Sequence, residues 1–282
     1  MKQILGDNQF FGINHNDIEK GNKTKEQFRT NESITDFIKG SIGLGLNGFM
    51  LNSNDRGFKI VSEIQLNDAT EVHYSIPYPH KFATMVNESG MLHLLQYVLA
   101  NSTINSLLRQ SPKFIFSRNI KHLLPLIIDL EIPNKLKKGS YVYLQNIVTD
   151  LILGLKREDL LFEYCRIIQE KGFKPGLITL NPTLLEKHVT SYPIDLQKDM
   201  IICFNINKTG FNVFPSREKV ESFIYNKHEF KKMGMSILSS GGVNNIKDSL
   251  DYIKKLGLDY VVYGSSKITN IEDNFKSLQI IN

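Results

Sequence analysis

Cysteine is scarce in this sequence, and the spacings that build metal sites are missing. Only two cysteines occur among 282 residues, Cys165 and Cys203, each in an apolar or amphipathic stretch. They form neither a disulfide framework nor a zinc-ligand spacing, so we expect two buried thiols in a reducing compartment. The seven histidines show no H-x-x-H or H-E-x-x-H pattern. His80, Asp7 and His15 could surround a metal, but their spacing follows no metal-site pattern. No metal is therefore predicted.

Strong net charge and long apolar runs are also absent. The net charge is +5, and the densest lysine run, NKLKKGS (134–140), has no interleaved aromatic residues. Such a run is typical of a solvated loop rather than a nucleic-acid surface. No apolar run is long enough for a bilayer span, and MKQILGDNQF reaches polar residues too early for a signal peptide. We therefore expect a cytoplasmic protein that binds a small-molecule substrate, with no nucleic-acid or membrane partner.

The chain does contain short apolar runs that alternate with longer amphipathic stretches. The predicted strands are 3–10, 47–53, 71–79, 141–147, 176–182, 200–206, 235–241 and 259–265. Each is followed by a helix candidate, and continuous apolar runs are typical of buried parallel strands. Eight such units predict a single α/β domain over 1–282, a (β/α)₈ barrel. An open doubly wound sheet is the alternative, but the first strand lacks a G-x-G-x-x-G turn after it.

One connection, residues 80–140, is longer than a barrel needs. It contains two helix patterns, 90–108 and 118–132. We expect an enlarged helical connection between the third and fourth strands. It could form a lid, a homo-oligomer contact or extra packing, since long ordered connections usually have a role.

Polar residues follow almost every predicted strand, at the end where barrels carry their active sites. Asn and Asp also favour turns for local reasons, but the recurrence of amides predicts a pocket that binds its ligand through hydrogen bonds. The candidate substrate-binding residues are Asn8, Asn52, Gln145, Asn146 and Asn205. The candidate catalytic residues are Asp7, Arg56, Tyr78, His80 and Lys208.

Two Gly/Ser turns follow the last two predicted strands. Backbone N–H groups at the start of a following helix favour an anion, and barrels commonly bind phosphate there. The sequence therefore predicts a phosphate site in these turns, whose residues are Ser239, Gly241, Gly242, Gly264, Ser265, Ser266 and Lys267.

These features resemble the aldo/keto reductases. The ending YGSSKITNIEDNFKSL (263–278) is similar to that family's P-[KG]-[ST] turn followed by R-I-x-E-N-[FL]. The resemblance implies NAD or NADP as cofactor, with Ser265 at its phosphate, Asp273 and Asn274 at its adenine, and Asn181 near its nicotinamide amide. Asn270 replaces the arginine for the 2′-phosphate. Three other stretches, 4–12, 41–49 and 171–188, resemble family motifs in the same order.

The sequence departs from the family at its proton-donating tetrad. Met50 takes the aspartate position, and Asp55 or Arg56 the tyrosine position. The strand-three lysine is missing from YSIPY (74–78), and the strand-four histidine falls near Asn146. Since carbonyl reduction needs a positioned acid, the resemblance implies the fold more securely than the activity.

Three functions remain open from the sequence. The first is an oxidoreductase that acts on a carbonyl of a sugar-like, phosphorylated or nucleotide-linked substrate, with a replacement acid. The second is a non-redox lyase, aldolase or isomerase on a phosphosugar, in which Lys208 could form a Schiff base unless it is an exposed loop charge. The third is a non-catalytic ligand-binding barrel.

Overall fold

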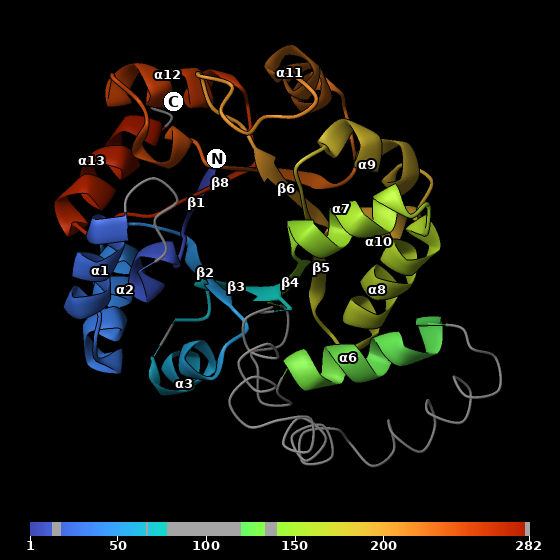
Figure 1. Ribbon diagram of the computed structural model, residues 1–282, viewed down its shortest axis with the longest axis horizontal. Coiled ribbons are helices and arrows are strands. Elements are labelled where there is room, and N and C mark those ends of the chain that lie inside the picture. Colours follow the sequence, from blue (N-terminus) through green and yellow to red (C-terminus); the bar gives the residue numbers. More distant parts are fainter. Residues whose placement is uncertain (13–17, 66, 78–119, 133–139, 280–282) are drawn as a thin grey trace.

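The computed structural model describes residues 1–12, 18–65, 67–77, 120–132 and 140–279. Eight parallel strands close into one barrel, in the order in which they occur in the chain (Figure 1). The strands are β1 (Lys2–Leu5), β2 (Gly48–Asn52), β3 (Glu71–Ile76), β4 (Tyr141–Leu144), β5 (Lys174–Thr179), β6 (Ile201–Asn205), β7 (Lys231–Met235) and β8 (Tyr260–Tyr263). The predicted (β/α)₈ barrel is confirmed.

Helices surround the strands (Figure 1). They are α1 (Ile18–Gln27), α2 (Asn31–Gly43), α3 (Asp55–Glu63), α6 (Leu124–Glu131), α7 (Asn146–Gly154), α8 (Glu158–Glu170), α9 (Pro182–Val189), α10 (Ile194–Asp199), α11 (Arg217–Tyr225), α12 (Ile246–Lys255) and α13 (Ile268–Leu278). Short 3₁₀ turns are η1 (Asn8–Phe11), η2 (Ile120–Leu123) and η3 (Ser239–Gly241). Several helices begin at a residue whose side chain accepts an N–H of the first turn, as Asn245 does for α12.

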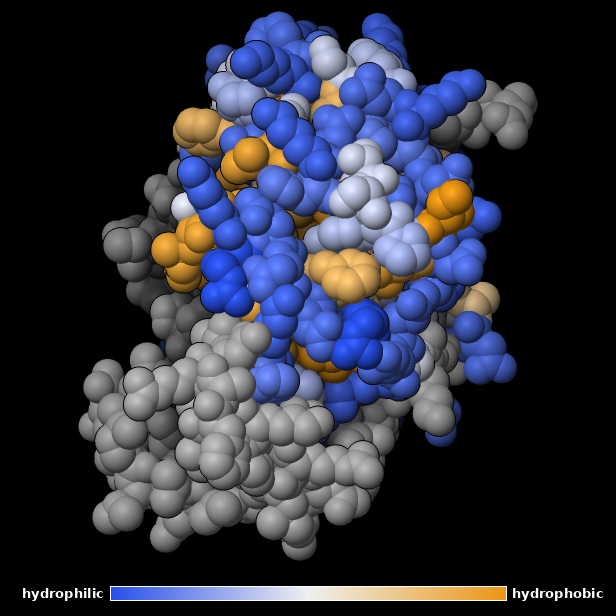
Figure 2. Space-filling view, turned by 90° about the vertical axis from the view of Figure 1, so that its right-hand side faces the viewer, coloured by the Kyte–Doolittle hydropathy of each residue, from blue (hydrophilic) through white to orange (hydrophobic). Residues whose placement is uncertain are grey.

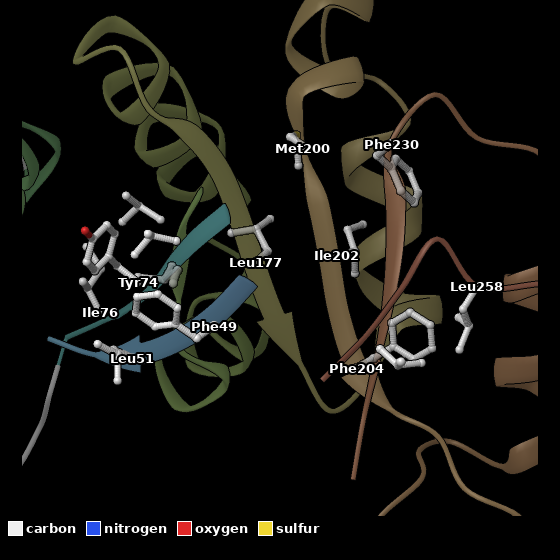
Figure 3. Close-up of a cluster of buried hydrophobic side chains, with 14 of the residues drawn as sticks. Phe49, Leu51, Tyr74, Ile76, Leu177, Met200, Ile202, Phe204, Phe230 and Leu258 are labelled. Atoms are coloured by element: carbon white, nitrogen blue, oxygen red, sulfur yellow. The ribbon is translucent and has the colours of Figure 1, made fainter. Parts of the chain in front are cut away.

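The main apolar core lies between the strands and the helices. Phe49, Tyr74, Leu177, Ile202 and Phe204 point outward from their strands and are at most 1% exposed. Figure 3 shows these side chains on the outer faces of the strands. Both cysteines are fully buried, as expected, and burial raises their thiol pKa values.

A second cluster fills the barrel interior, and the buried His73 packs against it. The Nε2 of His73 lies 3.3 Å from Glu71 Oε2, and its Nδ1 lies 2.9 Å from the hydroxyl of Tyr143. His73 stacks on Tyr141 with ring centroids 4.9 Å apart. The ring of Tyr143 occupies the space beside Gly176, where a Cβ would overlap it.

The seventh strand differs from its prediction. We expected it at 235–241, but β7 ends at Met235 and the following residues form a loop. The observed strand contains two lysines, and both find partners in the folded protein. Lys232 donates to the carbonyls of Ile224 and Asn226 at the end of α11, and Lys231 reaches the Tyr141 hydroxyl. Tertiary hydrogen bonds therefore outweigh the low strand propensity of lysine.

The connection between β3 and β4 contains η2 and α6 in its described part, which agrees with the helix pattern at 118–132. The pattern at 90–108 lies outside the described residues. The side of the molecule on the right in Figure 1 is mostly hydrophilic, with separate apolar residues (Figure 2). In the parts of the chain that the structure describes, no helix is both long and apolar enough to cross a membrane.

Candidate active site

Three of the predicted amides lie at one height inside the barrel mouth. The register of the paired strands shifts along the barrel axis from one strand to the next. Four inward positions on alternate strands therefore lie at the same height: Asn52 of β2, Gln145 after β4, Asn205 of β6 and Gly264 after β8. Alternate strands of such barrels contribute the four side chains of one interior layer. We call these four positions the mouth layer. It lies at the C-terminal ends of the strands, where the sequence predicted the site.

The fourth position of the mouth layer is filled by a side chain from elsewhere. Gly264 has no side chain, and a Cβ built there would overlap Oε1 of Gln9. Gln9 is buried, and its Nε2 donates to the carbonyl of Gly6 at 2.6 Å. The absent side chain of Gly264 therefore lets Gln9 supply a fourth amide at the mouth.

Asp7 lies beside this layer, directly after β1, and is 5% exposed. Its carboxylate accepts the backbone N–H of Asn52 at 2.7 Å and the side-chain amide of Asn52 at 3.0 Å. Burial raises the pKa of Asp7 to about 6, although the hydrogen bonds from Asn52 lower it in part. A carboxyl that titrates near neutral pH can both accept and donate a proton in solution.

A chain of hydrogen bonds links Asp7 to the next residue of the layer. Asn52 donates to Asp7, and Gln145 Nε2 donates to Asn52 Oδ1 at 2.7 Å. The amide of Asn52 is therefore held in one orientation, because its nitrogen faces a carboxylate and its oxygen faces a donor.

Asn205 lies at the β6 side of the mouth and is 6% exposed. Its Nδ2 donates to the carbonyl of Asn212 at 2.9 Å, whereas its buried Oδ1 has no hydrogen-bond partner in the part of the chain that the structure describes. The nearby Asn207 has bonds for both its amide atoms within the 206–213 loop and to Ser236. Asn207 therefore shapes the loop, and Asn205 is the residue with bonding capacity left.

The turn after β7 uses most of its predicted anion donors internally. The N–H of Gly241 donates to Leu238, and that of Gly242 donates to Ser239. The Ser239 hydroxyl lies 2.7 Å from that of Thr209. Of the two predicted phosphate turns, this one therefore has fewer donors to offer a ligand.

The turn after β8 retains more donors. The Ser265 oxygen accepts the N–H of Lys267 at 3.2 Å and the side-chain amide of Asn270 at 3.1 Å. Its hydroxyl proton is still able to donate, and Lys267 is exposed. The carbonyl of Ser266 accepts Gln27 Nε2.

Two further catalytic candidates have other contacts. Arg56 donates to the carbonyl of Phe28 and to Asn31, so it ties α3 to the start of α2. Lys208 is exposed and pairs with Asp248 on α12. A Schiff-base lysine is usually desolvated, so this position resembles the exposed loop charge that the sequence left open. Tyr78 and His80 lie outside the described residues.

The remaining predicted ligand-binding residues are spread over the same face and the last helix. Asn181 caps α9, because its Oδ1 accepts the N–H of Leu184 at 3.1 Å. Asn8 is exposed, Asn146 is the first residue of α7, Asp273 is exposed on α13, and Asn274 is buried there. Their roles as ligand contacts stay predictions.

Gln9 was not among the candidate site residues, although it is one of the polar residues at the end of the first predicted strand. The glycine at 264 was interpreted as a phosphate contact. The sequence does not show that another side chain fills the space above that glycine. In the described segments, no group of three His, Cys, Asp or Glu side chains is placed to hold a metal.

The closed barrel of eight parallel strands places the chain among the (β/α)₈ barrels, and solved structures share this fold. A protein from Pseudomonas aeruginosa named as a putative aldo-keto reductase matches 98% of this chain and 89% of its own, with a TM-score of 0.57 and 10% identity. An aldo-keto reductase from Bacillus halodurans, in its holo form, matches 89% of this chain and 83% of its own, with a TM-score of 0.51 and 8% identity. At identities this low, the comparison shows that the chain shares the fold of these proteins and shows nothing of its activity.

No family model and no curated protein matches the sequence. A protein named an aldolase matches with a TM-score of 0.44, which is too low to support a conclusion.

Proposed function

We propose that this protein is an enzyme that transfers a proton to or from an oxygen of a small, sugar-like substrate, at a carbonyl or hydroxyl carbon. Asp7 is the acid and base. Asn52, Gln145, Asn205 and Gln9 orient the substrate at the barrel mouth.

A single observation carries this proposal. Asp7 is a buried carboxyl with a pKa of about 6, which lies at the C-terminal end of the barrel strands and is held by Asn52. A structural carboxylate is usually held ionised by cations or several donors, whereas acid–base catalysts have a pKa near the working pH. Asp7 would then replace the tetrad that the sequence lacks. Its carboxyl would protonate the developing alkoxide in reduction, or accept the hydroxyl proton in the reverse direction.

A nicotinamide cofactor fits one end of this site. NAD or NADP would supply or accept the hydride, and the Ser265 hydroxyl with Lys267 would hold one of its phosphates. Gly241 and Gly242 fit less well, because their N–H groups already have partners. Asn270 donates to Ser265 and carries no charge for a 2′-phosphate, so we expect no strong preference for NADP(H).

The N–H groups of Gly241 and Gly242 already have partners, which favours a second candidate, a cofactor-independent isomerase. In this enzyme Asp7 moves the proton between neighbouring carbons and oxygens. A screen of keto and hydroxy sugars separates the two candidates: activity that requires NAD(H) or NADP(H) supports the reductase, and activity without a dinucleotide supports the isomerase. A cytoplasmic location and a homo-oligomer through 80–140 stay predictions.

The test of Asp7 is the pH dependence of kcat/KM on the best substrate of that screen. We expect an inflection near pH 6 in the wild type. Asp7→Asn should lower kcat/KM by about 10²- to 10⁴-fold and remove that inflection. The matched control is Asp195→Asn, at an exposed carboxyl on α10, which should change neither. An unchanged rate and profile in Asp7→Asn would show that another group carries the proton.

A further inference from the structure

In the mouth layer, hydrogen-bond partners are divided unevenly between amide nitrogens and amide oxygens. Each amide nitrogen uses one of its two N–H groups on a protein oxygen, whereas three of the four amide oxygens have no donor among the described residues. Asn52 donates to Asp7, and Gln145 donates to Asn52. Asn205 donates to the carbonyl of Asn212, and Gln9 donates to that of Gly6.

These partners also fix which way each amide points. Backbone carbonyls and an ionised carboxylate only accept, so the atoms that face them must be the nitrogens. The Gln145 amide then follows from that of Asn52, whose oxygen faces it. The division is therefore a result of the hydrogen-bond network rather than of an arbitrary choice between amide oxygen and nitrogen.

Three amide oxygens of the layer have no donor among the described residues. They are Oε1 of Gln145, Oδ1 of Asn205 and Oε1 of Gln9; the Asn205 oxygen is fully buried. Asp7 adds a carboxylate beside them, and the hydrogen bonds it accepts come from Asn52, an uncharged residue. A buried acceptor without a donor destabilises a protein, so a ligand that supplies donors is favoured here.

We propose that the mouth layer is an acceptor site, which binds the hydrogen-bond-donating and non-anionic part of a ligand. The donors are either the hydroxyl groups of a polyol or a protonated amine. A carboxylate or phosphate is disfavoured in the layer, because it would face three unpartnered amide oxygens and the carboxylate of Asp7, which forms no ion pair among the described residues. Any phosphate of the ligand then lies outside the layer, in the direction of Ser265 and Lys267.

This inference rests on the proposed function, because it takes the ligand of the mouth layer to be the substrate of Asp7. It adds the chemical class of that substrate. It also indicates which of the substrate's two forms the site binds better. A hydroxyl presented to Asp7 is placed to lose its proton, so the alcohol form of the substrate is the form that the layer holds best.

The test uses three probes with the same six-carbon chain: sorbitol, its amine analogue glucamine, and gluconate. Each is titrated calorimetrically into the full chain at a pH above the pKa of Asp7. We expect gluconate to bind at least tenfold more weakly than the better of the other two, or about 1.4 kcal/mol. Tightest binding of sorbitol identifies hydroxyl groups as the natural donors, and tightest binding of glucamine identifies an ammonium group.

Variants show whether the probes bind at the layer. Asn205→Leu removes the buried oxygen and should weaken the preferred probe at least tenfold. Gln9→Met is a second variant, in case Asn205→Leu does not fold. The control is Asn226→Ala, at an amide after α11 that donates to Glu186, which should leave the affinity unchanged.

Two results overturn the acceptor site: gluconate binding as tightly as the other probes, or none of the three binding at its highest soluble concentration. Equal affinities in wild type, Asn205→Leu and Gln9→Met also overturn it. These measurements do not involve turnover. If Asp7→Asn abolishes activity while gluconate binds best, the acceptor site fails and the proposed function stands. If the probes behave as expected but Asp7→Asn keeps its rate, the proposed function fails and the acceptor site stands.

Discussion

Ser265 is the residue whose hydrogen bonds bear most directly on the predicted anion site. Its oxygen accepts from Lys267 and Asn270, so an aspartate could accept the same two N–H groups and keep the turn folded. The added negative charge would repel a bound phosphate. We therefore expect Ser265→Asp to weaken binding of inorganic phosphate at least tenfold, about 1.4 kcal/mol, with little change in melting temperature. Titration followed by ³¹P NMR measures this affinity.

The control for Ser265→Asp carries the same charge change at an exposed serine elsewhere in the chain. Ser191 lies in the turn between α9 and α10, where its hydroxyl donates to His188. Ser191→Asp should leave the phosphate affinity as in the wild type. Equal weakening by both variants would indicate a general charge effect, and no weakening by either would place the anion elsewhere.

At the level of helices and strands, the features that follow from strand order were predictable from the sequence. The features that depend on contacts between distant residues were not. Asn52, Gln145 and Asn205 were predictable together, because residues that follow parallel barrel strands meet at one end. The position of β7 was not, because Lys231 and Lys232 become compatible with a strand only through their partners. The space above Gly264 was not predictable either, since Gln9 lies more than two hundred residues away in the chain.

The β7 lysines give a prediction for this element. Lys232 is 7% exposed and donates to two carbonyls at the end of α11, with its ammonium 5.5 Å from the ring centre of Phe223. Lys232→Met leaves those carbonyls without that donor and should lower the free energy of unfolding by about 1–3 kcal/mol. Urea denaturation measures this loss, and hydrogen exchange near 222–226 should quicken.

Lys231→Met is the matched control on the same strand. Lys231 makes one long contact, 3.3 Å to the Tyr141 hydroxyl, so its loss should change stability by less than the loss of Lys232. An equal or larger effect of Lys231→Met would show that the carbonyl contacts of Lys232 are not what stabilises β7.

For the whole molecule, two buried groups in the barrel should make stability depend on pH in opposite directions. Burial raises the pKa of Asp7 to about 6 from 3.8, so the folded state binds its proton more readily than the unfolded chain. The contribution of Asp7 therefore favours folding increasingly as the pH falls from about 6 towards 4. Burial lowers the pKa of His73 below 6.5, although Glu71 raises it in part. The contribution of His73 is therefore lost as the pH falls below about 6.5.

The two effects oppose each other in the wild type between about pH 6 and pH 5, and single variants should separate them. Glu71 has a pKa of about 2, because hydrogen bonds from His73 and Lys2 outweigh the effect of burial, and it begins to lose its contribution only below about pH 4.5. Asp7→Asn leaves the His73 effect, so its stability should fall more steeply with acid than that of the wild type. At pH 7.5, the same variant escapes the penalty of an ionised buried carboxylate, on the order of 3 kcal/mol at most.

His73→Gln should behave in the opposite way, because it keeps hydrogen-bonding groups beside Glu71 and Tyr143 but does not titrate. With the Asp7 effect alone, its stability should rise as the pH falls from about 6.5 to 5. Urea unfolding at half-unit steps of pH measures all three slopes. Parallel curves for the wild type and both variants would contradict this account, because the pH dependence would then come from groups outside the barrel interior and its mouth.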